Sequence, residues 1–236
     1  MAKPARWLIV NADDLGLSAA TNAGIFQAHT HGIVTSASLM VTQSAAVDAL
    51  RASREFPRLS IGLHVDLADW SYRNEKWTYE IAPLDDLAAV EMETLRQIAR
   101  FRELAGRDPT HLDSHQHVHR ARMVRPIFEK IAAKLALPLR GCAERIAFYG
   151  AFYGRGKTEA YPQNITAEHL CRAIRELGPG VTELSCHPGY DRQLDSDYRD
   201  ERIQEVETLC DARVRAEIEQ QNVALISFAD LSSVAS

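Results

Sequence analysis

The sequence predicts an α/β fold in which about seven parallel strands form a closed or nearly closed (β/α) barrel. Seven short runs of β-branched and apolar residues recur along the 236-residue chain, and segments with helical periodicity lie between most of them. This alternation is typical of parallel strands joined by right-handed crossovers. Seven such units favour a barrel over an open sheet, although the alternation alone does not separate the two architectures.

The predicted strands extend from the run RWLIVNA near the N-terminus to the run VALISFA near the C-terminus. Each combines β-branched or other apolar residues over a short length, which is the pattern of a buried strand. The strands are expected at residues 6–12, 33–41, 59–67, 110–115, 137–143, 181–187 and 223–229.

The helices are expected in the intervals between these strands. Residues 18–31 begin with Ser18, whose hydroxyl suits an N-cap, and end before Gly32, a residue typical of helix C-termini. Residues 85–105 place apolar side chains along one stripe at helical spacing. Further helices are predicted at 43–55, 120–136, 166–177 and 199–221.

The composition is that of a single folded domain, which we expect to span residues 1–236. Apolar residues make up 46% of the chain and charged residues 25%, so a full core can be buried. The 27 Lys and Arg residues against 32 Asp and Glu residues give a net charge of −5. Because the cations are scattered along the chain, a nucleic-acid partner is not expected.

The chain is expected to be cytoplasmic and to lack a membrane span. No stretch approaches the continuous apolar length that crosses a bilayer, and the N-terminal segment runs into a strand-like run without a secretion signal. The four cysteines are widely spaced and form no CxxC pair, which is typical of unpaired thiols in a reducing compartment.

Two loops that interrupt the alternation are rich in aromatic residues. Loops at the carboxyl ends of barrel strands build active sites, so exposed rings there suit stacking on sugar faces. The alternative is that these rings pack the loops onto the rim or onto a partner subunit, and we therefore also expect a homodimer. The candidate substrate-binding residues are Trp70 and Tyr72 in the loop 69–83, and Tyr149 and Tyr153 in the loop 147–162.

The segment HLDSHQHVH, residues 111–119, contains four of the nine histidines of the chain and one aspartate. If the segment is extended, side chains alternate between its two faces. One face then carries only titratable groups, which indicates a metal-binding or catalytic surface. The residues expected on this face are His111, Asp113, His115, His117 and His119.

Polar residues also gather at the carboxyl ends of other predicted strands, where they would meet at one rim of the barrel. Carboxylates buried there without a partner are costly, so they require solvent or a cation. One carboxylate with two imidazoles is a common ligand set for Zn²⁺ and other first-row divalent ions. These residues are Asp13 and Asp14 in the first strand, His64 in the third and His187 in the sixth.

Asp13 and Asp14 are expected to have different roles. Adjacent side chains of a strand point in opposite directions, so both reach one site only if the strand turns, and Gly16 permits such a turn. One carboxylate would then bind a metal ion while the other acts as a general base on the bound water. Spacing alone does not decide whether His115 and His117 share one ion or divide ligand and supporting roles.

The successive motifs IVNADDLGLS, GIVTSASLMV, IGLHVDL, PTHLDSHQHVH and LSCHPGY resemble those of the YdjC-like carbohydrate deacetylases, the family that includes chito-oligosaccharide deacetylases. The resemblance extends from about residue 8 to about residue 190, in order and with compatible spacing. It implies a distorted (β/α) barrel of the glycoside hydrolase/deacetylase type. It also implies metal-dependent removal of an N-acetyl group from an amino sugar or oligosaccharide.

The resemblance implies one divalent metal ion, with Asp14, His64 and His115 as its ligands. Asp113 and His117 are supporting residues in this scheme. Mg²⁺ and Zn²⁺ are the first candidates for the ion, and Mn, Co, Ni and Fe are alternatives. A bound ion of this kind polarises a carbonyl group and lowers the pKa of bound water toward about 7.

The resemblance also implies the two proton-transfer groups of the reaction. Asp13 would accept the proton of the attacking water, and His187 would protonate the amine that leaves. His111 and His119 fall outside the scheme.

Two alternatives of different classes stay open. The first is a metal-dependent amidohydrolase or phosphoesterase acting on another small substrate. A phosphate would require cations near the rim, and Arg73, Lys76, Arg155 and Lys157 are available. The second alternative is a non-catalytic protein that binds sugar or stores metal. Release of acetate rather than phosphate from an N-acetylglucosamine panel separates the first alternative from deacetylation.

Overall fold

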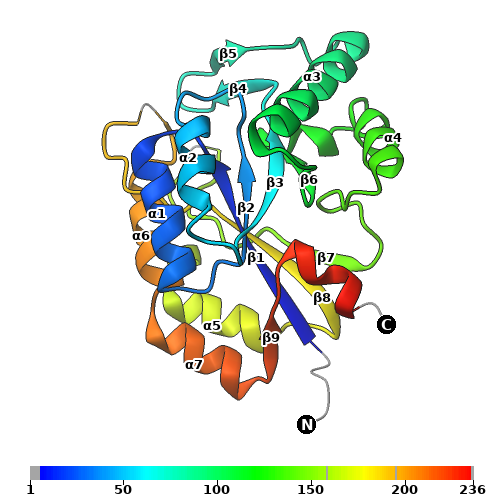
Figure 1. Ribbon diagram of the computed structural model, residues 1–236. Coiled ribbons are helices and arrows are strands. Elements are labelled where there is room, and N and C mark those ends of the chain that lie inside the picture. Colours follow the sequence, from blue (N-terminus) through cyan, green and yellow to red (C-terminus); the bar gives the residue numbers. More distant parts are fainter. Residues whose placement is uncertain (1–5, 158, 195, 235–236) are drawn as a thin grey trace.

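The computed structural model describes residues 6–157, 159–194 and 196–234. Its main sheet is a parallel half-barrel with the strand order β6-β3-β2-β1-β8-β7, and β9 adds to the start of β1. This confirms the predicted parallel α/β barrel-type fold, with β6 and β7 as the edges of the curled sheet (Figure 1). The strands are β1 (Arg6–Leu15), β2 (Ser36–Leu39), β3 (Ser60–Val65), β6 (Leu112–Ser114), β7 (Ile146–Tyr149), β8 (Gly180–Cys186) and β9 (Val223–Leu225).

Helices cover the outside of the sheet (Figure 1). Ser18 caps the first of them by accepting a hydrogen bond from the N–H of Thr21, as its position predicts. The predicted helix 199–221 is instead two helices, because Asp211 caps a new helix through the N–H of Arg213. The helices are α1 (Ala19–Thr30), α2 (Ala46–Ser53), α3 (Leu87–Ala105), α4 (Arg125–Leu135), α5 (Ala167–Arg175), α6 (Asp200–Leu209), α7 (Ala212–Gln220) and α8 (Leu231–Val234), with short 3₁₀ helices at His115–Arg120, Pro162–Ile165 and Phe228–Asp230.

The predicted strand 137–143 is wrong. Within it only Leu139 forms an isolated bridge to β6, because Pro138 lacks an N–H donor and Gly141 has a left-handed φ of 63°. The strand of this region is β7, which begins three residues later and includes the first residues of the expected loop 147–162. The aromatic loop 69–83 also contains regular structure, the antiparallel hairpin of β4 (Ala68–Ser71) and β5 (Lys76–Glu80).

The expected extended conformation of the whole segment 111–119 is also wrong. Strand β6 ends at Ser114, and Gln116 and His117 adopt left-handed φ angles of 48° and 53°. The Ser114 hydroxyl accepts from the N–H of His119 at 3.0 Å and bonds to the ring of the same residue at 2.7 Å, which stabilises the turn. The histidines of this segment therefore do not share one face.

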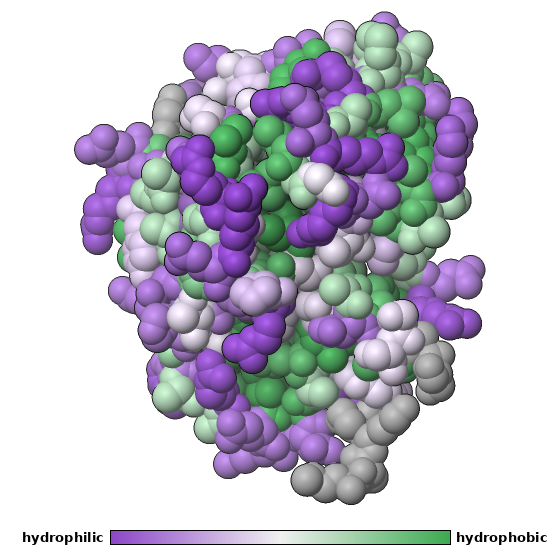
Figure 2. Space-filling model, in the orientation of Figure 1, coloured by the Kyte–Doolittle hydropathy of each residue, from purple (hydrophilic) through white to green (hydrophobic). Residues whose placement is uncertain are grey.

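The carboxyl ends of the parallel strands meet at one rim, where the β4–β5 hairpin also lies (Figure 1). β1 occupies the centre of the sheet, and its residues from Leu8 onward are all buried. On the face drawn in Figure 2, hydrophilic side chains alternate with exposed areas of hydrophobic ones. Among the described residues, none of the helices is long and apolar enough to cross a membrane.

Candidate functional site

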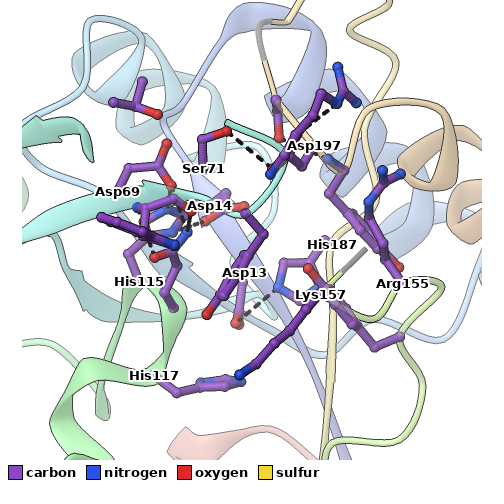
Figure 3. A pocket seen from close by; sticks show the side chains of 18 of the residues that line it. Asp13, Asp14, Asp69, Ser71, His115, His117, Arg155, Lys157, His187 and Asp197 are labelled. Carbon is purple, nitrogen blue, oxygen red and sulfur yellow. Dashed lines mark hydrogen bonds and ion pairs between the residues drawn. The ribbon is translucent and has the colours of Figure 1, made fainter. Parts of the chain in front are cut away.

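A cavity of about 640 Å³ lies at the rim formed by the carboxyl ends of the strands. All the residues expected to bind metal or to transfer protons line it, and so does His117 (Figure 3). Of the aromatic candidates, Trp70, Tyr72 and Tyr153 line the cavity. Tyr149 is not among the lining residues, and its hydroxyl lies 3.0 Å from His169 Nε2.

A local turn of the backbone brings Asp13 and Asp14 into the same cavity. Asp14 has a left-handed φ of 65°, and the pairing of β1 with β2 shifts register between Ala12 and Leu15. Aspartate adopts this conformation more readily than most residues do. The turn thus occurs at Asp14 itself, before Gly16, and both carboxylates become buried groups of the site.

Asp14, His64 and His115 form a group that fits a metal ion. The Asp14 Oδ1 atom is buried, and it lies 3.3 Å from His64 Nε2 and 3.3 Å from His115 Nδ1. Ligand atoms about 2.0–2.1 Å from a tetrahedral ion lie roughly 3.3 Å from one another. The donor set and its spacing therefore fit a divalent cation, with open positions for other ligands.

Each of the two histidines has a second carboxylate on its far nitrogen. His64 Nδ1 lies 2.7 Å from Asp113. His115 Nε2 lies 3.1 Å from Asp69 (Figure 3). Such partners fix the orientation of a metal-binding imidazole. Burial opposes protonation of both rings, but the contacts of His115 with Asp14 and Asp69 outweigh it and raise the pKa of His115 to about 9.

Asp13 is held by Arg140, which is fully buried beside it. The guanidinium donates to both carboxylate oxygens of Asp13, at 2.6 Å and 2.7 Å, and also binds Asp113 and Glu183. Burial would favour the neutral acid, but the charge of Arg140 keeps the pKa of Asp13 below its usual value. The pairing also makes the second possible metal group, Asp13 with His64 and Asp113, a poorer cation site, because its carboxylates already bind Arg140.

His187 faces Asp13 across the cavity, with its Nε2 atom 3.6 Å from Asp13 Oδ2 (Figure 3). The rings of Tyr153 and Tyr198 stack on each other at 4.3 Å, and each lies edge-on to His187 at 5.4 Å. Burial lowers the pKa of His187 to about 4, so the ring is neutral near neutral pH. Its backbone N–H donates to the carboxylate of Glu205.

Arg202 of α6 binds the other oxygen of Asp14. It is nearly fully buried and donates to Asp14 Oδ2 at 2.5 Å. The ion pair leaves Oδ1 as the atom that faces the two histidines. Arg202 therefore fixes which oxygen of Asp14 is available to a cation.

The β4–β5 hairpin closes one side of the cavity. Its Trp70 and Trp77 rings meet edge to face at 5.0 Å and line the mouth. Asp197 lies across the mouth and accepts from the backbone N–H of Arg73 at 3.1 Å, while its other oxygen pairs with the Arg73 guanidinium at 3.2 Å. The hairpin is thus joined to the loop that precedes α6.

The sequence pattern of the YdjC-like protein family matches residues 7–220. The chain belongs to the YdjC-like family. The match confirms the resemblance of its motifs to those of the YdjC-like carbohydrate deacetylases.

Relatives of this YdjC-like protein are similar over nearly their whole length. A chitooligosaccharide deacetylase of Serratia marcescens is 37% identical, covering 95% of this chain and 98% of the relative. A carbohydrate deacetylase of Geobacillus stearothermophilus is 35% identical, and the match covers 94% of this chain and 97% of the relative. A crystal structure from Enterococcus faecalis V583, whose name proposes cellobiose-phosphate cleavage, has a TM-score of 0.79 at 26% identity and covers 96% of this chain and 98% of its own.

The roles of three residues of the YdjC-like site were missed by sequence reasoning. Arg140 lies in a segment predicted as a strand, Arg202 lies at the start of a predicted helix, and Asp69 opens an aromatic loop. Only Arg140 carries a local signal, since it is a lone charge within an apolar run. Their partners are distant in sequence, so only the fold reveals their contacts.

Glu205 makes the stability of the YdjC-like protein depend on pH. Its fully buried carboxylate accepts from the Tyr198 hydroxyl at 2.5 Å and from the His187 N–H. Burial raises its pKa from an ordinary 4.5 to about 8, despite the opposing hydrogen bonds. Because the unfolded chain ionises at lower pH, protonated Glu205 favours the folded state, and this contribution is lost as the pH rises through about 8.

The variant Glu205→Gln should remove this dependence. Between about pH 6 and about pH 9, the unfolding free energy of the wild type should fall by roughly 2–3 kcal/mol, and that of the variant should not show this fall. Urea unfolding at both pH values measures the difference, with Glu207→Gln, an exposed position on the same helix, as control. Parallel pH profiles for Glu205→Gln and wild type would contradict the assignment.

Proposed function

We propose that this YdjC-like protein is a metal-dependent carbohydrate deacetylase that hydrolyses the N-acetyl group of an amino sugar or oligosaccharide. The proposal rests on one observation. A single cavity contains the group Asp14, His64 and His115, which fits a cation. In the same cavity, Asp13 and His187 face each other. The relatives named as chitooligosaccharide and carbohydrate deacetylases support this substrate class.

The metal ion would be held by Asp14 Oδ1, His64 Nε2 and His115 Nδ1. When bound, it supplies Lewis acidity that polarises the amide carbonyl and acidifies water. Two imidazoles and one carboxylate suit Zn²⁺ and the other first-row ions, while Mg²⁺ prefers oxygen ligands. We therefore place Zn²⁺ before Mg²⁺, with Mn, Co, Ni and Fe as further candidates.

Asp13 is the general base in this mechanism. Arg140 keeps it ionised and fixed, so it can accept the proton of the attacking water without rearrangement. The neutral His187 lies 3.6 Å away, close enough for the proton gained by Asp13 to reach its Nε2 atom. From there the proton is donated to the amine nitrogen, which cannot leave as an anion.

The mouth of the cavity is suited to a sugar. Trp70, Trp77 and Tyr153 provide aromatic surface beside the catalytic groups. A phosphate ester is less favoured, because two of the four cations at the mouth are already paired. Arg73 binds Asp197 and Arg155 binds Glu201.

The test is product analysis with defined metals. Protein stripped by a chelator is reloaded with Zn²⁺, Mg²⁺, Mn²⁺ or Co²⁺ and incubated with N-acetylglucosamine oligomers and with sugar phosphates. We expect acetate release that depends on the added metal and stops on chelation. Phosphate release without acetate would identify a phosphoesterase, and binding of the sugar without either product would identify a non-catalytic protein.

A further inference from the structure

His111 is fully buried and is not among the residues that line the cavity. The ring of Phe228 stacks on it at 3.8 Å, nearly parallel. On another side, a Cβ atom placed on Gly62 would come within 2.4 Å of the imidazole, so only glycine fits there. The ring is thus confined by its neighbours, and its remaining interactions are the hydrogen bonds of its two nitrogens.

The hydrogen bonds around His111 have only one consistent direction. Asp113 forms an ion pair with Arg140 at 2.7 Å, so it is a carboxylate that only accepts, and Ser38 must donate to its Oδ2 atom at 2.6 Å. A hydroxyl has a single proton, so in the 3.0 Å contact between Ser38 Oγ and His111 Nε2 the imidazole is the donor.

The other nitrogen of His111 completes the chain. Burial lowers the pKa of His111 to about 3, so the neutral ring carries its one proton on Nε2 and accepts at Nδ1. The Thr110 hydroxyl lies 3.0 Å from Nδ1, and Ser60 donates to Thr110 at 2.7 Å. From Ser60 to Asp113, every proton in this chain of hydrogen bonds points toward the carboxylate.

Asp113 is the end of the chain and the partner of a metal-binding histidine. Its Oδ2 atom accepts from Ser38 and from Arg140, which leaves Oδ1 to accept from His64 Nδ1 at 2.7 Å. Because Asp113 only accepts, His64 must carry a proton on Nδ1. The Nε2 atom of His64 is then the one that faces Asp14.

We propose that His111 is a positioning residue of the metal centre, acting through Ser38 and Asp113 on His64. This inference rests on the proposed metal-binding function. If the proton of His111 were on Nδ1, the Ser38 hydroxyl would turn to donate to Nε2, and Asp113 would lose one of its donors. The tautomer of His111, which lies outside the cavity, therefore determines how many hydrogen bonds Asp113 accepts. Asp113 in turn orients His64 inside the cavity.

The test compares two amides at this position. In His111→Gln the side-chain NH₂ can reach the place of Nε2 and donate to Ser38, whereas in His111→Asn the amide ends near the place of Nδ1. Cobalt affinity, measured by competition with a chelating dye and by the visible absorption of bound Co²⁺, should fall about 10-fold in His111→Asn. In His111→Gln it should stay within about 2-fold of wild type.

Ser38→Ala provides a second variant in case His111→Asn does not fold, and it should weaken Co²⁺ binding to a similar extent. Thermal unfolding of the metal-free variants measures the packing cost separately. Equal Co²⁺ affinities for wild type, His111→Asn and Ser38→Ala would overturn the inference while leaving the metal centre intact. Absence of Co²⁺ binding to wild type, or unchanged binding in Asp14→Asn, would overturn the proposed metal centre and the inference with it.

Discussion

Replacing Asp13 by asparagine should lower turnover by about 10³-fold while leaving the metal content near that of wild type. The amide cannot accept the proton of water, and its NH₂ group would face the N–H groups of Arg140. Because the cation-binding group consists of Asp14, His64 and His115, the ion should remain. Acetate release gives the rate, and elemental analysis of purified protein gives the metal content.

Asp86→Asn is a suitable control for this experiment. Asp86 is exposed and caps α3 through the N–H groups of Ala88 and Ala89, and asparagine caps helices equally well. Its turnover should match that of wild type. If Asp13→Asn kept more than about a tenth of the wild-type rate, Asp13 would not be the base. If it lost the ion, Asp13 would be a ligand instead.

Replacing Arg140 by methionine should destabilise the protein by about 3–5 kcal/mol at neutral pH. The guanidinium is the shared partner of Asp13, Asp113 and Glu183, all of which are almost completely buried. Methionine fills similar space but leaves these carboxylates without their counter-charge. Denaturant unfolding of metal-free protein measures the effect.

Two further measurements distinguish loss of charge from loss of packing. Arg140→Lys keeps the charge but not the planar fork, so its destabilisation should be smaller than that of Arg140→Met. For Arg140→Met, the destabilisation should shrink as the pH falls, because protonation neutralises the stranded carboxylates. A loss below about 1 kcal/mol in Arg140→Met would show that the carboxylates have other adequate partners.

The alternation of strands and helices was enough to predict the parallel barrel-type sheet, because each element has its own periodicity. What periodicity does not show is where a backbone turns. The segment after Ser114 continues the alternating pattern of β6, yet left-handed residues at Gln116 and His117 end the strand there. The run 137–143 is apolar enough for a strand, but the strand lies at Ile146–Tyr149.

The candidate site was predictable where its residues follow strands, since parallel strands bring their carboxyl ends together. Asp14, His64 and His115 meet in the cavity for this reason. Arg140 and Arg202 were not predictable, because an arginine that neutralises a buried carboxylate resembles a surface arginine in sequence. Their contacts with Asp13 and Asp14 span 127 and 188 residues of the chain.

The left-handed backbone of Asp14 affects how any knock-out at this position must be interpreted. Alanine there removes the carboxylate and also introduces strain of order 1 kcal/mol, since residues with a Cβ and no short polar group avoid this region. A poor yield of folded Asp14→Ala protein could then result from backbone strain as well as from loss of the metal ion. Asparagine tolerates the same conformation, so Asp14→Asn isolates the loss of the negative ligand and is the substitution to compare with wild type.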